Sequence, residues 1–135
     1  TSLLIFMAKL EKKLFFAAWS CKNKNYYAYQ TWDSPLRKIF KKIITFDPQE
    51  ELYLNGKKEM NSKFLSIIEL EKPDFVFLWL IYDEFYLETL LKIKELSPKT
   101  KTINFCGDDD FLFDNYSVYF SMFIDYFLVS HLEFI

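Results

Sequence analysis

Short apolar runs alternate along the chain with longer stretches in which apolar residues recur every three or four positions. Five apolar runs are typical of buried strands and span residues 13–19, 43–46, 75–80, 102–106 and 126–129. Each run is separated from the next by enough residues for a helix. Such regular alternation predicts a parallel sheet with helices on both faces.

Helix signals stand between these runs. Four helical stretches are predicted: one opened by Ser34 and Pro35, one from residue 57 to Pro73, one capped by Asp83 and ending before Pro98, and one over residues 115–124. The second has the clearest amphipathic spacing, with apolar residues at 60, 64, 67 and 68. Residues 50–56 show no regular pattern and are expected to be irregular.

The third apolar run is apolar on both faces, as a strand covered from both sides requires. We therefore predict an α/β, Rossmann-like, doubly wound sheet of three layers (α/β/α), with five parallel strands in the default order 3-2-1-4-5. In that order the first and fourth strands are neighbours. The loops 20–27 and 107–110 are then expected to meet at the carboxyl edge, where such sheets bind ligands.

Composition narrows the choice of protein class. The 135 residues are 51% hydrophobic and include only 2 Gly, so a single packed domain without a Gly-rich phosphate loop is expected. The longest nearly apolar run, 75–82, is far below the roughly 18–20 residues that span a bilayer. No signal-peptide pattern opens the chain. We predict a cytoplasmic protein without a transmembrane segment.

Charge and metal-ligating residues add further limits. The net charge of −2 combines +7 over residues 1–42 with −9 over the remainder. The basic half favours ordinary solvated lysines over a stripe for a nucleic-acid backbone, so no nucleic-acid partner is predicted. Two cysteines and one histidine are too few for a disulfide framework or a His/Cys metal site. We predict no cofactor.

An acidic turn, Gly107-Asp108-Asp109-Asp110, is the most informative local motif. It follows a predicted strand, where α/β folds place functional groups. Three interpretations remain open: the carboxylates hold Mg²⁺ or Mn²⁺, one of them orients a substrate hydroxyl, or they cap the next helix.

A phosphoryl-accepting receiver domain has the same number of strands as this chain is predicted to have. Phosphoryl acceptance needs aspartates directly after the first strand and at the end of the third. This chain has Trp19-Ser20-Cys21 at the first position and Leu80-Ile81 at the second. The placement of residues therefore argues against a phosphoryl-accepting receiver domain.

A series of short motifs resembles the amino-terminal domain of CgeB-type (spore-maturation type) glycosyltransferases. The series consists of Lys72-Pro73-Asp74 before the third strand, an aromatic strand running into Asp108-Asp109, and Asp125-Tyr126 near the end. It covers roughly residues 12–131. The resemblance implies that residues 12–135 form a Rossmann-like amino-terminal domain, with residues 1–11 left as an unassigned extension.

The resemblance implies a GT-B architecture, in which this domain faces the sugar acceptor and a carboxy-terminal domain or chain binds the nucleotide-sugar donor. Trp19 and Ser20 match the first loop of the family, and Asp108 and Asp109 match its acidic pair, so all four are expected in the acceptor cleft. No catalytic residue is assigned. Because GT-B enzymes generally do not rely on a D-x-D metal site, the resemblance also implies no bound metal. The implied function is the acceptor-side part of a glycosyltransferase, inactive without its partner domain. The alternative is a non-catalytic α/β binding module that pairs with another chain.

Overall fold

The computed structural model describes residues 8–80, 83–106 and 118–129. Five strands form one sheet: β1 (Leu10–Ala18), β2 (Phe40–Phe46), β3 (Phe75–Trp79), β4 (Lys101–Cys106) and β5 (Tyr126–Val129). The helical elements are η1 (Tyr29–Asp33), α1 (Ser34–Ile39), α2 (Pro48–Glu71), α3 (Leu87–Leu96) and α5 (Val118–Ser121). β1 begins at Leu10, inside the segment that the sequence left unassigned.

All neighbouring strands are parallel, and the order across the sheet is β2-β1-β3-β4-β5. The predicted α/β fold class is confirmed, but the predicted order 3-2-1-4-5 is wrong. β3 joins β1 on the side opposite β2, so that Leu14 pairs with Phe75 while Phe75 pairs with Lys101. β1 and β4 are therefore separated by β3, and the chain changes direction across the sheet between β1 and β3.

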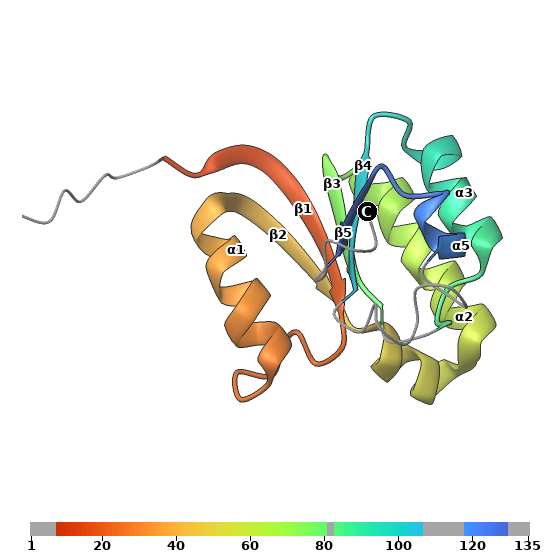
Figure 1. Ribbon diagram of the computed structural model, residues 1–135, viewed down its shortest axis with the longest axis horizontal. Helices are drawn as coiled ribbons and strands as arrows, with labels where there is room; N and C mark the ends of the chain where they lie inside the picture. The colour runs from red at the N-terminus through yellow and green to blue at the C-terminus, as the bar shows by residue number, and fades with distance from the viewer. Residues whose placement is uncertain (1–7, 81–82, 107–117, 130–135) are drawn as a thin grey trace, which may run out of the picture.

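The helices cover the two faces of the sheet unequally. In Figure 1, α1 lies on one side, and α2, α3 and α5 lie together on the other. This arrangement buries β3 from both sides, as its apolar sequence predicts. None of the helices that the structure describes combines the length and the apolar character needed to cross a membrane.

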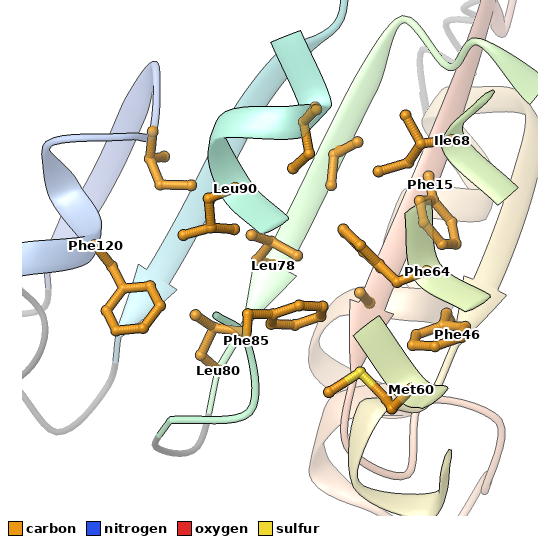
Figure 2. Close-up of a cluster of buried hydrophobic side chains, with 14 residues drawn as sticks. Phe15, Phe46, Met60, Phe64, Ile68, Leu78, Leu80, Phe85, Leu90 and Phe120 are labelled. Carbon is orange, nitrogen blue, oxygen red and sulfur yellow. The ribbon is translucent and has the colours of Figure 1, made fainter. Parts of the chain in front are cut away.

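The larger hydrophobic core lies between the sheet and α2, α3 and α5. Its centre is Phe64 of α2, which is fully buried. The Phe64 ring lies 5.2 Å from the ring of Phe15, 5.8 Å from that of Phe46 and 4.5 Å from that of Phe85, measured between centroids. Figure 2 shows these rings packed between β1 and the helices. The high Phe content of the chain is thus used for packing.

A second core fills the space between the sheet and the η1–α1 segment. Phe16 of β1 and Phe77 of β3 meet edge to face at 5.6 Å. Trp32 of η1 covers them, with its ring 5.0 Å from Phe77 and 5.1 Å from Phe105 of β4. One helical segment therefore packs on both β3 and β4 through a single large aromatic side chain.

The first helical segment begins earlier than predicted, because Ser34 is not a cap. η1 runs directly into α1, and the Ser34 N–H donates to the carbonyl of Tyr29, five residues earlier. Pro35 follows at once and has no N–H to give to the helix. A widened turn is a common way to accommodate such a residue inside a helix.

α2 also begins earlier than predicted, since residues 50–56 are helical. Asp47 caps the helix: its Oδ1 accepts the N–H groups of Gln49 and Glu50, both at 3.1 Å. The irregular sequence pattern reflects a kink at Gly56, whose φ of 84° and ψ of 166° lie outside helical geometry. The kink directs the first turns of α2, at the lower end of the sheet in Figure 1, to the carboxyl edge of β2.

Replacing Gly56 by alanine is expected to lower the free energy of unfolding by about 1–3 kcal/mol, because only glycine adopts this backbone conformation without strain. A Cβ at this position would meet no atom within 4 Å, so the cost comes from the backbone alone. Urea denaturation measures the change. Glu59→Ala, at an exposed site on the same helix, should change stability by less than about 0.5 kcal/mol. Equal effects would show that the kink is not needed.

The start of α3 differs from prediction as well. Asp83 does not cap it but forms an ion pair with Lys57 at 3.6 Å. The side chain of Asn61, buried on α2, performs the connecting role: its Oδ1 accepts the Tyr86 N–H at 3.1 Å and its Nδ2 donates to the Glu84 carbonyl at 3.0 Å. In the fourth predicted helix the structure has α5, and residues 115–117 lie outside the described residues.

Candidate functional site

Trp19 and Ser20, the two described residues among the four predicted for the site, lie at the carboxyl end of β1. They border a pocket of about 620 Å³, which we call the edge pocket. Its lining comes from two segments, the loop after β1 and the beginning of α2. The lining residues are Trp19, Ser20, Lys22, Asn23, Asp47, Gln49, Glu50 and Tyr53. The volume is in the range of small-molecule sites.

Asp47 joins the two walls of the edge pocket. Its Oδ2 accepts the backbone N–H of Ser20 at 2.7 Å, while its Oδ1 accepts the first N–H groups of α2. Three N–H donors thus share one carboxylate, and hydrogen bonds of this kind to a charged group are strong. Asp47 therefore fixes the distance between the loop and the helix and has little acceptor capacity left for a ligand.

Ser20 contributes through its backbone. It adopts a φ of 52°, in the left-handed region that is uncommon for residues other than glycine. This conformation directs its N–H to Asp47 and begins a tight turn, in which the Asn23 N–H donates to the Ser20 carbonyl at 3.0 Å. The turn presents Lys22 and Asn23 to the edge pocket. A contact of the Ser20 hydroxyl with a ligand stays a prediction.

Two exposed aromatic residues stand on opposite walls of the edge pocket. Trp19 is 46% exposed, and its ring packs edge to face on Tyr26 at 5.9 Å. Tyr53, on the first segment of α2, is 89% exposed. Exposed aromatic rings around a polar hollow are a frequent feature of binding sites, because they offer a large apolar area at low cost in conformational entropy.

The charges of the edge pocket are of both signs. Lys22 and Glu50 have no ion-pair partner among residues 8–80, 83–106 and 118–129. Their neighbour Glu51 is different: a hydrogen bond from Lys63 lowers the pKa of its carboxyl, and the charge of Lys22 lowers it further. The field of Lys22 thus extends to the first turn of α2.

Gln49 connects the edge pocket to the segment after β3. Its Nε2 donates to Oε1 of Glu84 at 2.6 Å, and Glu84 is buried. Part of the Gln49 side chain is thus committed to structure. This hydrogen bond links the wall of the edge pocket to the segment after β3.

Cys21 lies beneath the pocket and is fully buried. Its Sγ donates to the carbonyl of Phe46 at 3.6 Å. Burial, and to a smaller extent the nearby charge of Asp47, raises the pKa of the thiol to about 11. The thiol is therefore protonated near neutral pH and is a weak nucleophile.

Two results are expected from this burial. Iodoacetamide at pH 8 should leave Cys21 unmodified in the native protein and alkylate it in urea, as followed by peptide mapping. The unfolded thiol ionises near pH 9 and the folded one near pH 11, so stability should fall by up to about 2–3 kcal/mol across this interval. In Cys21→Ala that part of the loss should vanish. Equal pH profiles for the two proteins would contradict the assignment.

A second hollow, of about 460 Å³, lies at the opposite edge, near the amino ends of β1 and β2. Its lysines are matched by carboxylates: Lys12 pairs with Asp74, Lys13 and Lys42 with Glu71, and Lys41 with Glu11. The hydrogen bond that the Lys13 ammonium donates to the Glu71 carboxylate is the main reason that the pKa of Lys13 is raised. Since its charges are satisfied internally, this hollow is a weaker candidate than the edge pocket.

The positions that phosphoryl acceptance requires can be inspected directly. β1 is followed by Trp19 and Ser20, and β3 ends at Trp79 and is followed by the buried Leu80. Neither position carries a carboxylate, as the sequence indicated. Within the described part of the chain, no three His, Cys, Asp or Glu side chains are grouped so that they could hold a metal ion.

Sequence reasoning found one wall of the edge pocket and missed the other. Asp108 and Asp109 lie outside the described residues, so their predicted place in the site stays a prediction. Glu50 and Tyr53 were missed because residues 50–56 were expected to be irregular, and Gln49 was missed because no helix was predicted to begin there. The order Asp-Pro-Gln-Glu at 47–50 was an available signal, since it combines an N-cap residue, a first-turn proline and an early glutamate.

Comparisons with known proteins show the fold alone. No protein-family model and no curated protein match the chain. Among solved structures, it is similar to a mutant of the receiver domain of the histidine kinase CKI1 from Arabidopsis thaliana, with a TM-score of 0.52 and 16% identity over 87% of this chain and 80% of that one. It is also matched to the pilus assembly protein CpaE from Caulobacter crescentus CB15, with a TM-score of 0.45 and 12% identity over 93% and 86%.

These findings correct the functional expectation. The chain has the fold of a receiver domain with the order 2-1-3-4-5, and not the order expected for the Rossmann-like half of a GT-B enzyme. The predicted function as the acceptor-side part of a glycosyltransferase, with its nucleotide-sugar donor, is therefore wrong. The similarity of motifs to CgeB-type domains is not tested by these comparisons. The predicted absence of a cofactor, a metal and a nucleic-acid partner stays a prediction.

Proposed function

We propose that the chain is a non-catalytic regulatory domain with a receiver-like fold, which acts by binding a small molecule in the edge pocket and not by accepting a phosphoryl group. One observation carries the proposal. Trp19 and Ser20 occupy the end of β1, where phosphoryl chemistry needs a carboxylate, and they line a pocket of ligand size instead.

The state of Asp47 supports the same conclusion. It is the carboxylate of the edge pocket nearest to β2, yet three backbone N–H groups occupy its two oxygens. A carboxylate held in this way is poorly placed to attack phosphorus or to serve as a general base. It is well placed to keep a binding site in one shape before the ligand arrives, which reduces the entropy cost of binding.

The similarity to the receiver domain of a histidine kinase is the reason for proposing a regulatory role. Receiver-like sheets place their ligand-responsive groups at the carboxyl edge, which is where the edge pocket lies. The bond between Gln49 and Glu84 offers a route from the pocket to the segment after β3. A phosphoryl-accepting receiver is the competing function.

Intact-mass measurement separates these two functions. The purified chain is incubated with acetyl phosphate and Mg²⁺, beside a receiver domain with an intact acceptor aspartate as the positive control. We expect no mass increase for this chain and one phosphoryl group for the control. A mass increase of one phosphoryl group that is reversed by treatment with hydroxylamine would contradict the proposal.

Binding is tested with a panel of nucleotides, sugars, amino acids and organic acids, followed by the thermal unfolding midpoint. At least one class should raise the midpoint of the chain, as a ligand that binds only the folded state must. Trp19→Ala should abolish the rise, and Tyr119→Ala, an exposed aromatic on α5, should leave it unchanged. A panel without any effect would contradict the proposal.

We also infer a cytoplasmic location. The support is the free thiol of Cys21, which is buried and protonated, as is common in proteins of reducing compartments.

A further inference from the structure

We propose that the edge pocket binds a free α-amino acid with an apolar side chain, held as a zwitterion between Lys22 and Glu50. The inference rests on the proposed binding function and specifies its ligand class. It is drawn from three features of the pocket: two unpaired charges of opposite sign, a third charged group whose oxygens already accept hydrogen bonds, and two exposed aromatic rings.

The first feature is the separation of the two charges. Lys22 belongs to the loop after β1 and Glu50 to the first turn of α2, so they lie on different walls of the edge pocket. They are not within ion-pair distance of each other, and no other described residue pairs with either of them. A ligand that bridges the walls therefore meets an ammonium group on one side and a carboxylate on the other.

The second feature is the state of Asp47. Its two oxygens already accept three N–H groups, which leaves Lys22 and Glu50 as the charged side chains of the pocket that are free to pair with a ligand. A ligand that is only anionic would satisfy Lys22 and be repelled by Glu50, and a ligand that is only cationic would do the reverse. A zwitterion satisfies both, which is the condition for electrostatic complementarity.

The third feature is the pair of aromatic rings. Trp19 and Tyr53 are both exposed and flank the same hollow. Covering their apolar faces with an apolar surface of a ligand favours binding, because it removes apolar area from water. An apolar amino-acid side chain supplies such a surface. Trp19 is steadied by its contact with Tyr26, so one ring is already in place before binding.

Nucleoside diphosphates fit this pocket poorly. Their phosphates would bring at least two negative charges to a site with one free ammonium group and the carboxylates of Asp47 and Glu50. The N–H groups at the start of α2, which often bind phosphate, already donate to Asp47. Sugars would find hydrogen-bond partners here but would leave both charges without a counter-charge.

Isothermal titration calorimetry with three related compounds tests the proposal. L-phenylalanine carries both charges, 2-phenylethylamine carries only the ammonium group, and 3-phenylpropanoate carries only the carboxylate. L-phenylalanine is expected to bind at least about tenfold more tightly than either analogue, because only it satisfies both walls. Equal affinities for the three compounds would overturn the proposal.

Two variants assign the charges. In Lys22→Met, L-phenylalanine should lose its advantage over the amine, while the amine, no longer repelled by Lys22, should bind at least as tightly as before. In Glu50→Gln, L-phenylalanine should lose its advantage over the acid. The controls Lys38→Met and Glu69→Gln change exposed charges on α1 and α2 outside the pocket and should have no effect. The reverse assignment, or loss of affinity in the controls, would overturn the proposal.

The panel of compound classes separates this inference from the function on which it rests. If a sugar or another class binds the edge pocket and no amino acid does, the ligand class is wrong while the binding function stands. If no class binds, both are wrong.

Discussion

Phe64→Ala is expected to lower the free energy of unfolding by about 3–5 kcal/mol, the largest effect of any substitution considered for this chain. Phe64 is fully buried, and its ring is within 6 Å of three other phenylalanine rings from β1, β2 and the segment before α3. Alanine would leave a cavity that these rings cannot fill without moving the strands.

Guanidinium denaturation measures the loss. Leu70→Ala is the matched control, because Leu70 is on the same helix and is 81% exposed. It should change stability by less than about 0.5 kcal/mol. If the two variants are equally stable, α2 does not pack on the sheet through the face that carries Phe64.

Asp47→Ala is expected to have the second largest effect, a loss of about 2–3 kcal/mol, since an N-cap and a further charge-assisted hydrogen bond disappear together. The Ser20 N–H would lose its acceptor, as would the first N–H groups of α2. Because these bonds shape the edge pocket, the variant should also bind the ligand more weakly than the wild type.

Asp47→Asn gives a graded comparison. Its amide keeps one acceptor oxygen, so either the cap of α2 or the bond to Ser20 can be retained, and an intermediate loss of stability is expected. Denaturation in urea measures all three proteins. A loss in Asp47→Ala no larger than that of an exposed substitution such as Glu59→Ala would show that Asp47 does not join the two walls.

The strands could be predicted from the sequence because the strands of a buried parallel sheet are short, continuous apolar runs. The run 75–80 is apolar on both faces, and the structure places β3 between β1 and β4 with helices on each side. No comparable sequence pattern indicates the order of the strands in the sheet. It depends on the side of β1 to which the connection through α2 returns, and that is decided by packing between residues far apart in the chain.

One wall of the candidate site was predicted, and the other was missed for a similar reason. Trp19 and Ser20 follow a strand that the apolar pattern predicted, whereas Tyr53 lies on the first segment of α2, before the kink at Gly56, which was expected to be irregular. The resemblance to glycosyltransferase domains failed as a guide to function because alternating strands and helices occur in several folds with unrelated activities.

Binding of a ligand in the edge pocket should change the surroundings of the residues that line it. The most direct measurement is a titration of the ¹⁵N-labelled protein with L-phenylalanine, and then with the other compound classes, followed by amide chemical shifts. We expect changes in the amide chemical shifts of residues 19–23 and 47–53, with no change at Lys12, Lys41 and Asp74 at the opposite edge. Shifts confined to the opposite edge, or no shifts with any compound class, would contradict it.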